Sequence, residues 1–142
     1  TIHDRLLRGP FALGKMQRAL DMCISWSKQR YTFGKPLAER QAIQWKLVDM
    51  YTDIQSLRAL TYQMAARYDQ GEDIRVEAGL IKLTSMDWGA RCLDHGIQIH
   101  GAMGESLELP LTLFYRYLRH GQIGGGTSEI QRMQIARKLL KD

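Results

Sequence analysis

The stretch RQAIQWKLVDMYTDIQSLRALTYQMAARYD, residues 40–69, decides the fold. Its core-type residues recur at alternating steps of four and three: Ile43, Leu47, Met50, Ile54, Leu57, Thr61, Met64 and Tyr68. This spacing places them on one stripe of a helix, as in the seam of a helical bundle. It predicts a helix from about Arg40 to Asp69, which Gln70-Gly71-Glu72-Asp73 ends.

Similar stripes predict long helices on both sides of this one. Upstream, Leu13, Met16, Leu20 and Cys23 indicate a helix that reaches Arg30, with a kink or a restart expected at Gly9-Pro10 and a connector at residues 32–36. Downstream, a second stripe predicts a helix that ends at Gly101: Val76, Leu80, Leu83, Met86, Ala90, Leu93 and Ile97.

The last third of the chain reads as a loop from Ala102 to Pro110 and a short helix from Leu111 to Leu118. A final helix follows, with one apolar face: Ile130, Met133, Ala136 and Leu140. No strand is predicted. Apolar stripes of this kind can be buried only against each other. We therefore expect an all-α fold in a single domain over residues 1–142, an antiparallel up-down four-helix bundle with a short additional helix.

The composition restricts the class of protein. With 44% hydrophobic and 25% charged residues, and no apolar run near the ~20 residues of a spanning helix, the chain is expected to be a soluble globular domain without a transmembrane segment. The formal net charge is +5, and arginine supplies most of the basic residues. They are spread along the chain rather than gathered in a basic stripe, so nucleic acid is not the expected ligand.

The two cysteines, Cys23 and Cys92, fall inside helical patterns without metal-ligand spacing, so buried free thiols, no metal site and a reducing intracellular compartment are expected. The compartment would be the cytoplasm of a bacterium, or the mitochondrial matrix or peroxisome of a eukaryote. The chain opens on Thr1 without a signal peptide, and the missing Met indicates a fragment or a processed product.

Three polar segments could carry chemistry. In Gln29–Leu37, QRYTFGKPL, the cations either cap a helix C-terminus or bind an anion, with Arg30 on a phosphate and Phe33 against a flat ring. In Gln98–Glu105, QIHGAMGE, glycines end a helix, and His100 reads more readily as a structural histidine than as a catalyst. In Ile123–Arg132, IGGGTSEIQR, Ser128 and Gln131 fit a capping box at an anion-friendly helix N-terminus.

Taken in order, these segments resemble the C-terminal helical domain of the acyl-CoA dehydrogenases, FAD enzymes that desaturate acyl-CoA thioesters. The matching motifs are RYTFGKPL at Arg30–Leu37 followed by Gln41, QIHGAMG from Gln98, and GTSEIQR at Gly126–Arg132. The resemblance covers essentially the whole chain. It implies an FAD site shared between subunits of a homotetramer or homodimer, and electron-transfer flavoprotein as a possible acceptor.

The resemblance also implies roles for single residues. Arg30, Thr32, Phe33 and Gln41 would reach the adenosine and pyrophosphate part of a neighbouring subunit's FAD. Gln98, Gly101 and Ala102 would close over that pyrophosphate, and Thr127 and Glu129 would contact FAD at the start of the last helix. Arg5 and Gly125 would lie against the acyl-CoA substrate.

The reaction of this family needs a carboxylate base, which many members carry immediately before the Gly-Thr of the third motif, where this chain has Gly125. Other members, the isovaleryl-CoA type among them, carry it before an Arg on the first helix, where this chain has Asp4 followed by Arg5. Asp4 is therefore the candidate base. Alternatively, Asp4 is a helix N-terminal carboxylate, or pairs with Arg8.

A second departure from the family pattern is Tyr117, which stands after Arg116 where an Asp is common. Three functions compete. The chain is the C-terminal domain of an active acyl-CoA dehydrogenase, inactive when isolated; or it belongs to a catalytically silent flavin-holding or assembly subunit; or it is a bundle module without flavin.

Overall fold

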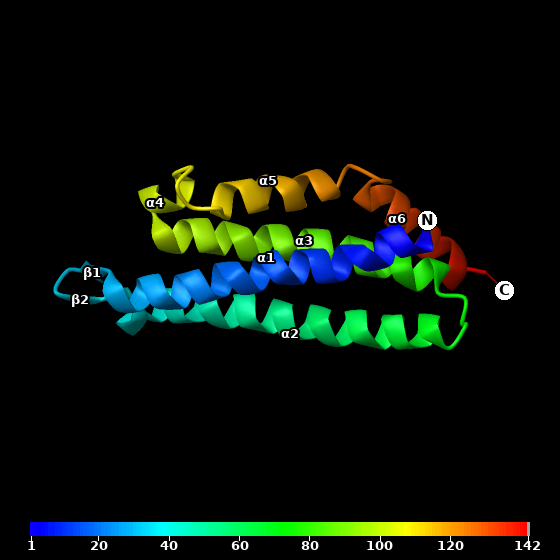
Figure 1. Cartoon of the computed structure of the whole chain (residues 1–142), viewed down its shortest axis with the longest axis horizontal. Coiled ribbons are helices and arrows are strands. Elements are labelled where there is room, and N and C mark those ends of the chain that lie inside the picture. The colour runs from blue at the N-terminus through cyan, green and yellow to red at the C-terminus, as the bar shows by residue number, and fades with distance from the viewer. Residues whose placement is uncertain (142) are drawn as a thin grey trace.

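The computed structural model describes residues 1–141, which form a helical bundle (Figure 1). Three long helices pack side by side: α1 (Ile2–Gln29), α2 (Gln41–Asp69) and α3 (Arg75–His100). The fourth position is divided between two shorter helices, α5 (Leu111–Gly121) and α6 (Ser128–Leu139), which follow each other along α3. The predicted all-α bundle is thus confirmed, and both termini lie at the same end of it.

The stripe that predicted α2 forms its inner face. Met50, Ile54 and Leu57 are fully buried, whereas Ile43 and Leu47 near the start of the helix are half-buried. The core is completed by small residues of α1, among them Ala12 and Ala19, which allow the helices to approach closely.

Helix α3 is the central helix, because it packs against α1, α2, α5 and α6. One stripe was predicted for it, but residues outside that stripe are also buried: Ala78, Ile81, Lys82, Ser85 and Cys92. A helix surrounded by neighbours needs more than one buried face, and small or polar residues can supply the additional ones when they find partners.

A kink or a restart was predicted at Gly9-Pro10, and the restart is wrong, because α1 is a single helix from Ile2 to Gln29 with Pro10 inside it. Packing against α2 and α3 holds this segment in one helix. Gly9 has a structural role here: a Cβ added to it would lie 2.5 Å from Oγ1 of Thr61 on α2.

The prediction of no strand is also wrong for the connector after α1. The short strands β1 (Tyr31–Thr32) and β2 (Lys35–Pro36) pair antiparallel, and the 3-10 turn η1 (Leu37–Glu39) leads into α2. Phe33 and Gly34 both have positive φ angles, 48° and 81°, which is the backbone of a two-residue hairpin turn. Strands of two residues are too short for an alternating sequence pattern to reveal them.

The segment predicted as a loop after Gly101 contains one helical turn, α4 (Ala102–Glu105). Gly101 changes the chain direction with a φ of 60°. Gly104 lies so close to the backbone of Ile97 that no side chain would fit there.

The predicted apolar face of the last helix is wrong. Ile130 and Met133 are each 40% exposed, and Leu140 is 83% exposed, whereas the polar Gln131 is fully buried. The side of α6 that faces α3 is polar, with ion pairs from Arg132 to Asp87 at 2.9 Å and from Lys138 to Glu77 at 2.8 Å.

Both cysteines are buried and free, as expected, and burial raises the pKa of the Cys23 thiol to about 12. Within residues 1–141, no helix combines the length and the apolar character that crossing a membrane would require.

Candidate functional site

A cavity of about 390 Å³, the hairpin cavity, lies where the end of α1, the hairpin and the α3–α4 junction meet. It brings together the predicted cofactor residues Arg30, Thr32, Gln98, Gly101 and Ala102 from two distant parts of the sequence. Apolar and aromatic residues complete its lining: Trp26, Leu37, Ile43, Ile99, His100 and Met103.

The backbone at the end of α1 positions the cationic side of this cavity. Arg30 leaves the helix in an extended conformation, its N–H still donating to the Trp26 carbonyl at 2.8 Å. Its own carbonyl accepts from the Leu37 N–H at 2.9 Å, which ties the hairpin to the helix end. These two hydrogen bonds hold the backbone of Arg30 at the edge of the cavity.

Arg40 was missed by the sequence reasoning. Its guanidinium donates to the carbonyl of Thr32, and at 3.4 Å to that of Phe33, so it holds the hairpin from the other side. The predicted site residues Phe33 and Gln41 do not line the hairpin cavity: Phe33 is 98% exposed at the turn, and Gln41 is exposed at the start of α2.

His100 forms part of the cavity wall in a structural setting. Its ring stacks on Trp26 with 5.3 Å between centroids, and Nδ1 lies 2.8 Å from the Gly96 carbonyl. Burial lowers the pKa of His100, which favours a neutral ring at physiological pH. These contacts agree with the expectation of a structural histidine.

Thr127 and Glu129 line a different cavity of about 330 Å³, the α6 cavity. The predicted capping box of Ser128 and Gln131 is wrong: Thr127 is the N-cap, its Oγ1 accepts from the Ile130 N–H at 3.3 Å, and the side chain of Ile130 has no acceptor to complete a box. Positive φ angles at Gly125 and Gly126 turn the chain into the helix here. Ser128 is the first helical residue, and its hydroxyl lies 3.4 Å from Asp87.

The hairpin cavity and the α6 cavity have no lining residue in common. Figure 1 shows the hairpin and α6 at opposite ends of α3. The predicted cofactor residues therefore fall into two groups that one chain does not bring together.

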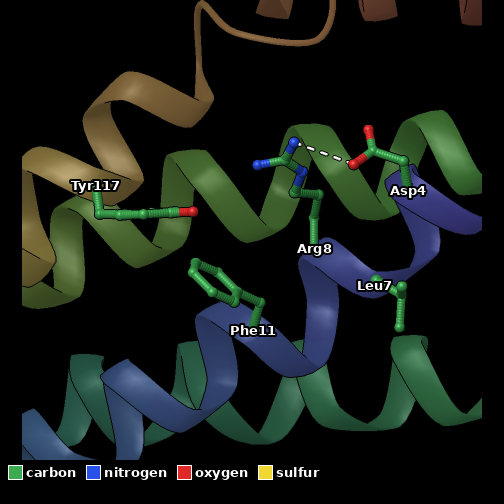
Figure 2. A pocket seen from close by; sticks show the side chains of 5 residues that line it. All are labelled: Asp4, Leu7, Arg8, Phe11 and Tyr117. Carbon is green, nitrogen blue, oxygen red and sulfur yellow. Dashed lines mark hydrogen bonds and ion pairs between the residues drawn. The ribbon is translucent and has the colours of Figure 1, made fainter.

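Asp4 and Gly125, predicted on separate grounds, are neighbours. A Cβ added to Gly125 would lie 3.6 Å from Oδ2 of Asp4. The Asp4 carboxylate also pairs with the Arg8 guanidinium at 3.2 Å, the alternative considered from the sequence. Asp4 and Arg8 both line a cavity of about 220 Å³, the Asp4 cavity, which is completed by Leu7, Phe11 and Tyr117 (Figure 2).

Two further cations lie close to Asp4. Lys82 is 1% exposed, and its ammonium donates to the carbonyl of Gly126, so it ties α3 to the glycine loop. Burial lowers the pKa of Lys82, and repulsion from Arg8 and Arg5 adds to that effect. The predicted substrate residue Arg5 donates to Oε1 of Gln134 on α6 at 3.0 Å.

Lys82 was missed because its role depends on a carbonyl far away in the sequence. The only signal was a lysine inside the short apolar run AGLIKL, residues 78–83. Among residues 1–141, no group of His, Cys, Asp and Glu side chains is arranged to hold a metal ion.

Fold and cavities together define a class of protein: a helical domain that presents a cationic hydrogen-bonding cavity and, separately, a carboxylate beside a glycine loop. The family model described as "Acyl-CoA dehydrogenase, C-terminal domain" matches residues 2–140. The chain therefore belongs to the acyl-CoA dehydrogenase family, as its C-terminal domain.

Individual relatives agree with this assignment. The chain is 40% identical over 130 residues to the mitochondrial short-chain specific acyl-CoA dehydrogenase of Bos taurus, covering 92% of this chain and 32% of that protein. The solved butyryl-CoA dehydrogenase of Megasphaera elsdenii is 36% identical, with a TM-score of 0.92, covering 96% of this chain and 36% of the other. A structure described as PigA with FAD and proline is 26% identical, with a TM-score of 0.92, covering 97% and 36%. The chain spans about a third of the length of the curated relatives it matches.

Proposed function

We propose that the whole protein is an FAD-dependent acyl-CoA dehydrogenase that desaturates an acyl-CoA thioester between its α and β carbons, with Asp4 as the base. The observation that carries this proposal is the meeting of Asp4 and Gly125. A carboxylate on the first helix occupies the space beside the position where many family members carry their base. A shift of base between these positions keeps the proton acceptor in the same place.

The hairpin cavity suits an anionic cofactor group. Its lining includes Arg30, Thr32 and Gln98, which carry a guanidinium, a hydroxyl and an amide. At Gly101 an added Cβ would meet open space, so a ligand can approach the backbone closely. A diphosphate is the kind of group that such donors bind. Arg30, Thr32, Gln98, Gly101 and Ala102 would hold FAD here, with Thr127 and Glu129 contacting it from another subunit.

In the reaction, Asp4 would accept the α-proton of the thioester, and bound FAD would accept the hydride from the β-carbon. Other residues of this chain would position that base. Lys82 holds the carbonyl of Gly126, which fixes the loop beside Asp4. Arg8 holds the carboxylate of Asp4 from the next turn of α1.

The isolated domain would not turn over substrate, because it lacks the remaining two thirds of its relatives' length. A homotetramer or homodimer would complete the flavin site, since the two groups of predicted cofactor residues lie apart in one chain. Electron-transfer flavoprotein would be a suitable acceptor.

The base is tested in the full-length protein loaded with FAD. Asp4→Asn should slow flavin bleaching by a panel of acyl-CoA thioesters, under anaerobic conditions, by about 10²–10⁴-fold, because the amide cannot accept the proton. Undiminished bleaching would exclude Asp4 as the base. The alternative, a catalytically silent flavin-holding subunit, is favoured by Gly125 and by the Asp4–Arg8 pair, and it predicts bound FAD that no thioester reduces.

The cofactor site is tested with Arg30→Ala, which should weaken FAD binding by about 1–3 kcal/mol through loss of a charged hydrogen bond. Lys28→Ala removes an equal charge from the same end of α1 outside the cavity, and should change FAD affinity much less. Flavin content after dialysis measures both. A full-length protein that takes up no added FAD would contradict the proposed function.

A further inference from the structure

The Asp4 cavity holds more than the candidate base. Figure 2 shows the guanidinium of Arg8 between the carboxylate of Asp4 and the hydroxyl end of Tyr117, which points toward it. The ring of Phe11 lies beneath the ring of Tyr117 in this view, with 4.7 Å between their centroids. The cavity therefore has a carboxylate at one end, a guanidinium bonded to it in the middle, a phenol hydroxyl beyond the guanidinium, and an aromatic floor.

The charge around this cavity is positive. Arg8, Arg5 and Lys82 surround Asp4, and the latter two are engaged with Gln134 and with the Gly126 carbonyl. Arg8 is bonded to Asp4, with its side chain 22% exposed. A guanidinium has five N–H donors, and most of those of Arg8 remain available to a ligand in the cavity.

A hydrocarbon acyl chain could contact the aromatic floor but would leave the guanidinium without a partner. It would cover the guanidinium and deprive it of water without supplying an acceptor, which costs free energy. An acyl group that ends in a carboxylate would instead form a charge-assisted pair with Arg8 and accept a hydrogen bond from Tyr117. The aromatic floor would contact the methylene groups between the two ends.

Resting on the proposed function, we propose that the Arg8–Tyr117 pair recognises a second carboxylate on the acyl group, so that the substrates are mono-CoA thioesters of dicarboxylic acids. Nη2 of Arg8 lies 3.2 Å from Oδ1 of Asp4, so a ligand carboxylate on the other donors of the guanidinium would lie one guanidinium width away from the base. That separation suits a carboxylate a few bonds beyond the carbon that loses its proton. When the substrate's carboxylate takes over Arg8, the Asp4 carboxylate is released to accept that proton.

The test compares thioesters with equal numbers of carbon atoms on the full-length protein with FAD: glutaryl-CoA against valeryl-CoA, and adipoyl-CoA against hexanoyl-CoA. At least one dicarboxylic ester should have a kcat/KM about tenfold or more above its partner, the size of one charged hydrogen bond. Arg8→Leu should abolish or reverse this ratio, and Arg8→Lys should retain part of it. Tyr117→Phe, which removes only the hydroxyl, should lower it several-fold.

Arg18→Leu is the matched control, since it removes an exposed arginine from the same helix outside the Asp4 cavity and should leave the ratio unchanged. A ratio of one or below for both pairs in the unmodified protein overturns the proposal, as does a ratio that Arg8→Leu and Tyr117→Phe leave unchanged. These results can occur with full flavin reduction, in which case the proposed dehydrogenase function stands.

If no thioester reduces the flavin, the proposed function fails, and the same four esters are titrated by calorimetry. A tenfold preference in Kd for a dicarboxylic ester, lost in Arg8→Leu, then supports carboxylate recognition without catalysis. Equal affinities, or no binding of any ester, overturn it.

Discussion

Asp4 and Gly125 show how one chemical group can be supplied from two places in a chain. Gly125 has a φ of 69°, which an L-residue adopts only at a cost of about 1–2 kcal/mol. Its added Cβ would contact Asp4, Arg8 and Lys82 at ordinary van der Waals distances, 3.6–3.8 Å. The space beside Asp4 can therefore accept a side chain at this position.

This geometry makes a prediction for the base. In the full-length protein, Asp4→Asn combined with Gly125→Glu should regain at least about tenfold of the flavin reduction lost in Asp4→Asn, because a carboxylate returns to the same space. Stopped-flow bleaching under anaerobic conditions measures it. Gly124→Glu in the same background is the control, since a Cβ there would meet Nε2 of His120 at 2.8 Å. Equal rates for both double variants would contradict a shared position for the base.

For some single residues the sequence motifs did not predict the position that the structure shows. Phe33 and Gln41 were expected at the cofactor with Arg30, yet they lie outside the hairpin cavity. In a shared site they could still face another subunit, because both are exposed. Arg40, which fixes the hairpin, had no motif to reveal it.

At the scale of elements, helix α1 is held in place by close contacts with α2. Gly9 and Gly14 lie in the same helix but in different surroundings: an added Cβ would be 2.5 Å from Thr61 Oγ1 at Gly9, and would meet nothing within 4 Å at Gly14. The two positions therefore separate the effect of packing from the effect of helix propensity.

We expect Gly9→Ala to lower the free energy of unfolding of this chain by about 1–3 kcal/mol through overpacking between α1 and α2. Gly14→Ala should raise it by about 0.5–1 kcal/mol, because alanine is the better helix former and the site is exposed. Urea denaturation followed by circular dichroism measures both. A stabilising Gly9→Ala would show that α1 and α2 are not packed this closely.

Helix α6 illustrates an element whose existence could be predicted but whose orientation could not. Its apolar residues Ile130, Met133 and Leu140 obey helical spacing, yet they face outward. The side that faces α3 carries the buried Gln131 and the ion pair Lys138–Glu77, and sequence periodicity contains no information about those partners. The lowered pKa of Glu77, caused first by its bond to Lys138, reflects the same contact.

For the molecule as a whole, buried histidines predict a pH dependence of stability. Burial lowers the pKa of His95 and of His100 in the folded chain. As the pH decreases, the unfolded chain binds protons at these two residues near pH 6.5, whereas the folded chain binds them only at lower pH. The free energy of unfolding should therefore be highest above that pH and fall as the pH decreases from about 7 to 5.

Urea midpoints at several pH values measure this effect. His100→Gln should flatten the dependence, whereas His120→Gln, which changes an exposed histidine, should not. Carboxylates whose pKa is lowered, such as Glu77, affect stability only at lower pH, since unfolded Glu titrates near 4.3. A midpoint constant between pH 5 and 7 would contradict the burial of neutral histidines.

The sequence by itself determined the helices, the all-α class and the ordered motifs that the family comparison supports. Helix stripes can be recognised in the sequence because backbone hydrogen bonds join residues four apart. The period of burial therefore depends only on residues that are close together in the chain. The same locality explains the failures: the hairpin strands were too short for a period, and the multiple buried faces of α3 depend on its neighbours.

Only the tertiary structure decided which distant residues share a space. It placed Asp4 beside Gly125, Lys82 on the Gly126 carbonyl, and Arg8 opposite Tyr117. It also separated Thr127 and Glu129 from the hairpin cavity. The physical reason is that the relative rotation and position of packed helices depend on side chains from different helices at once, and no single stretch of sequence contains both partners of such a contact.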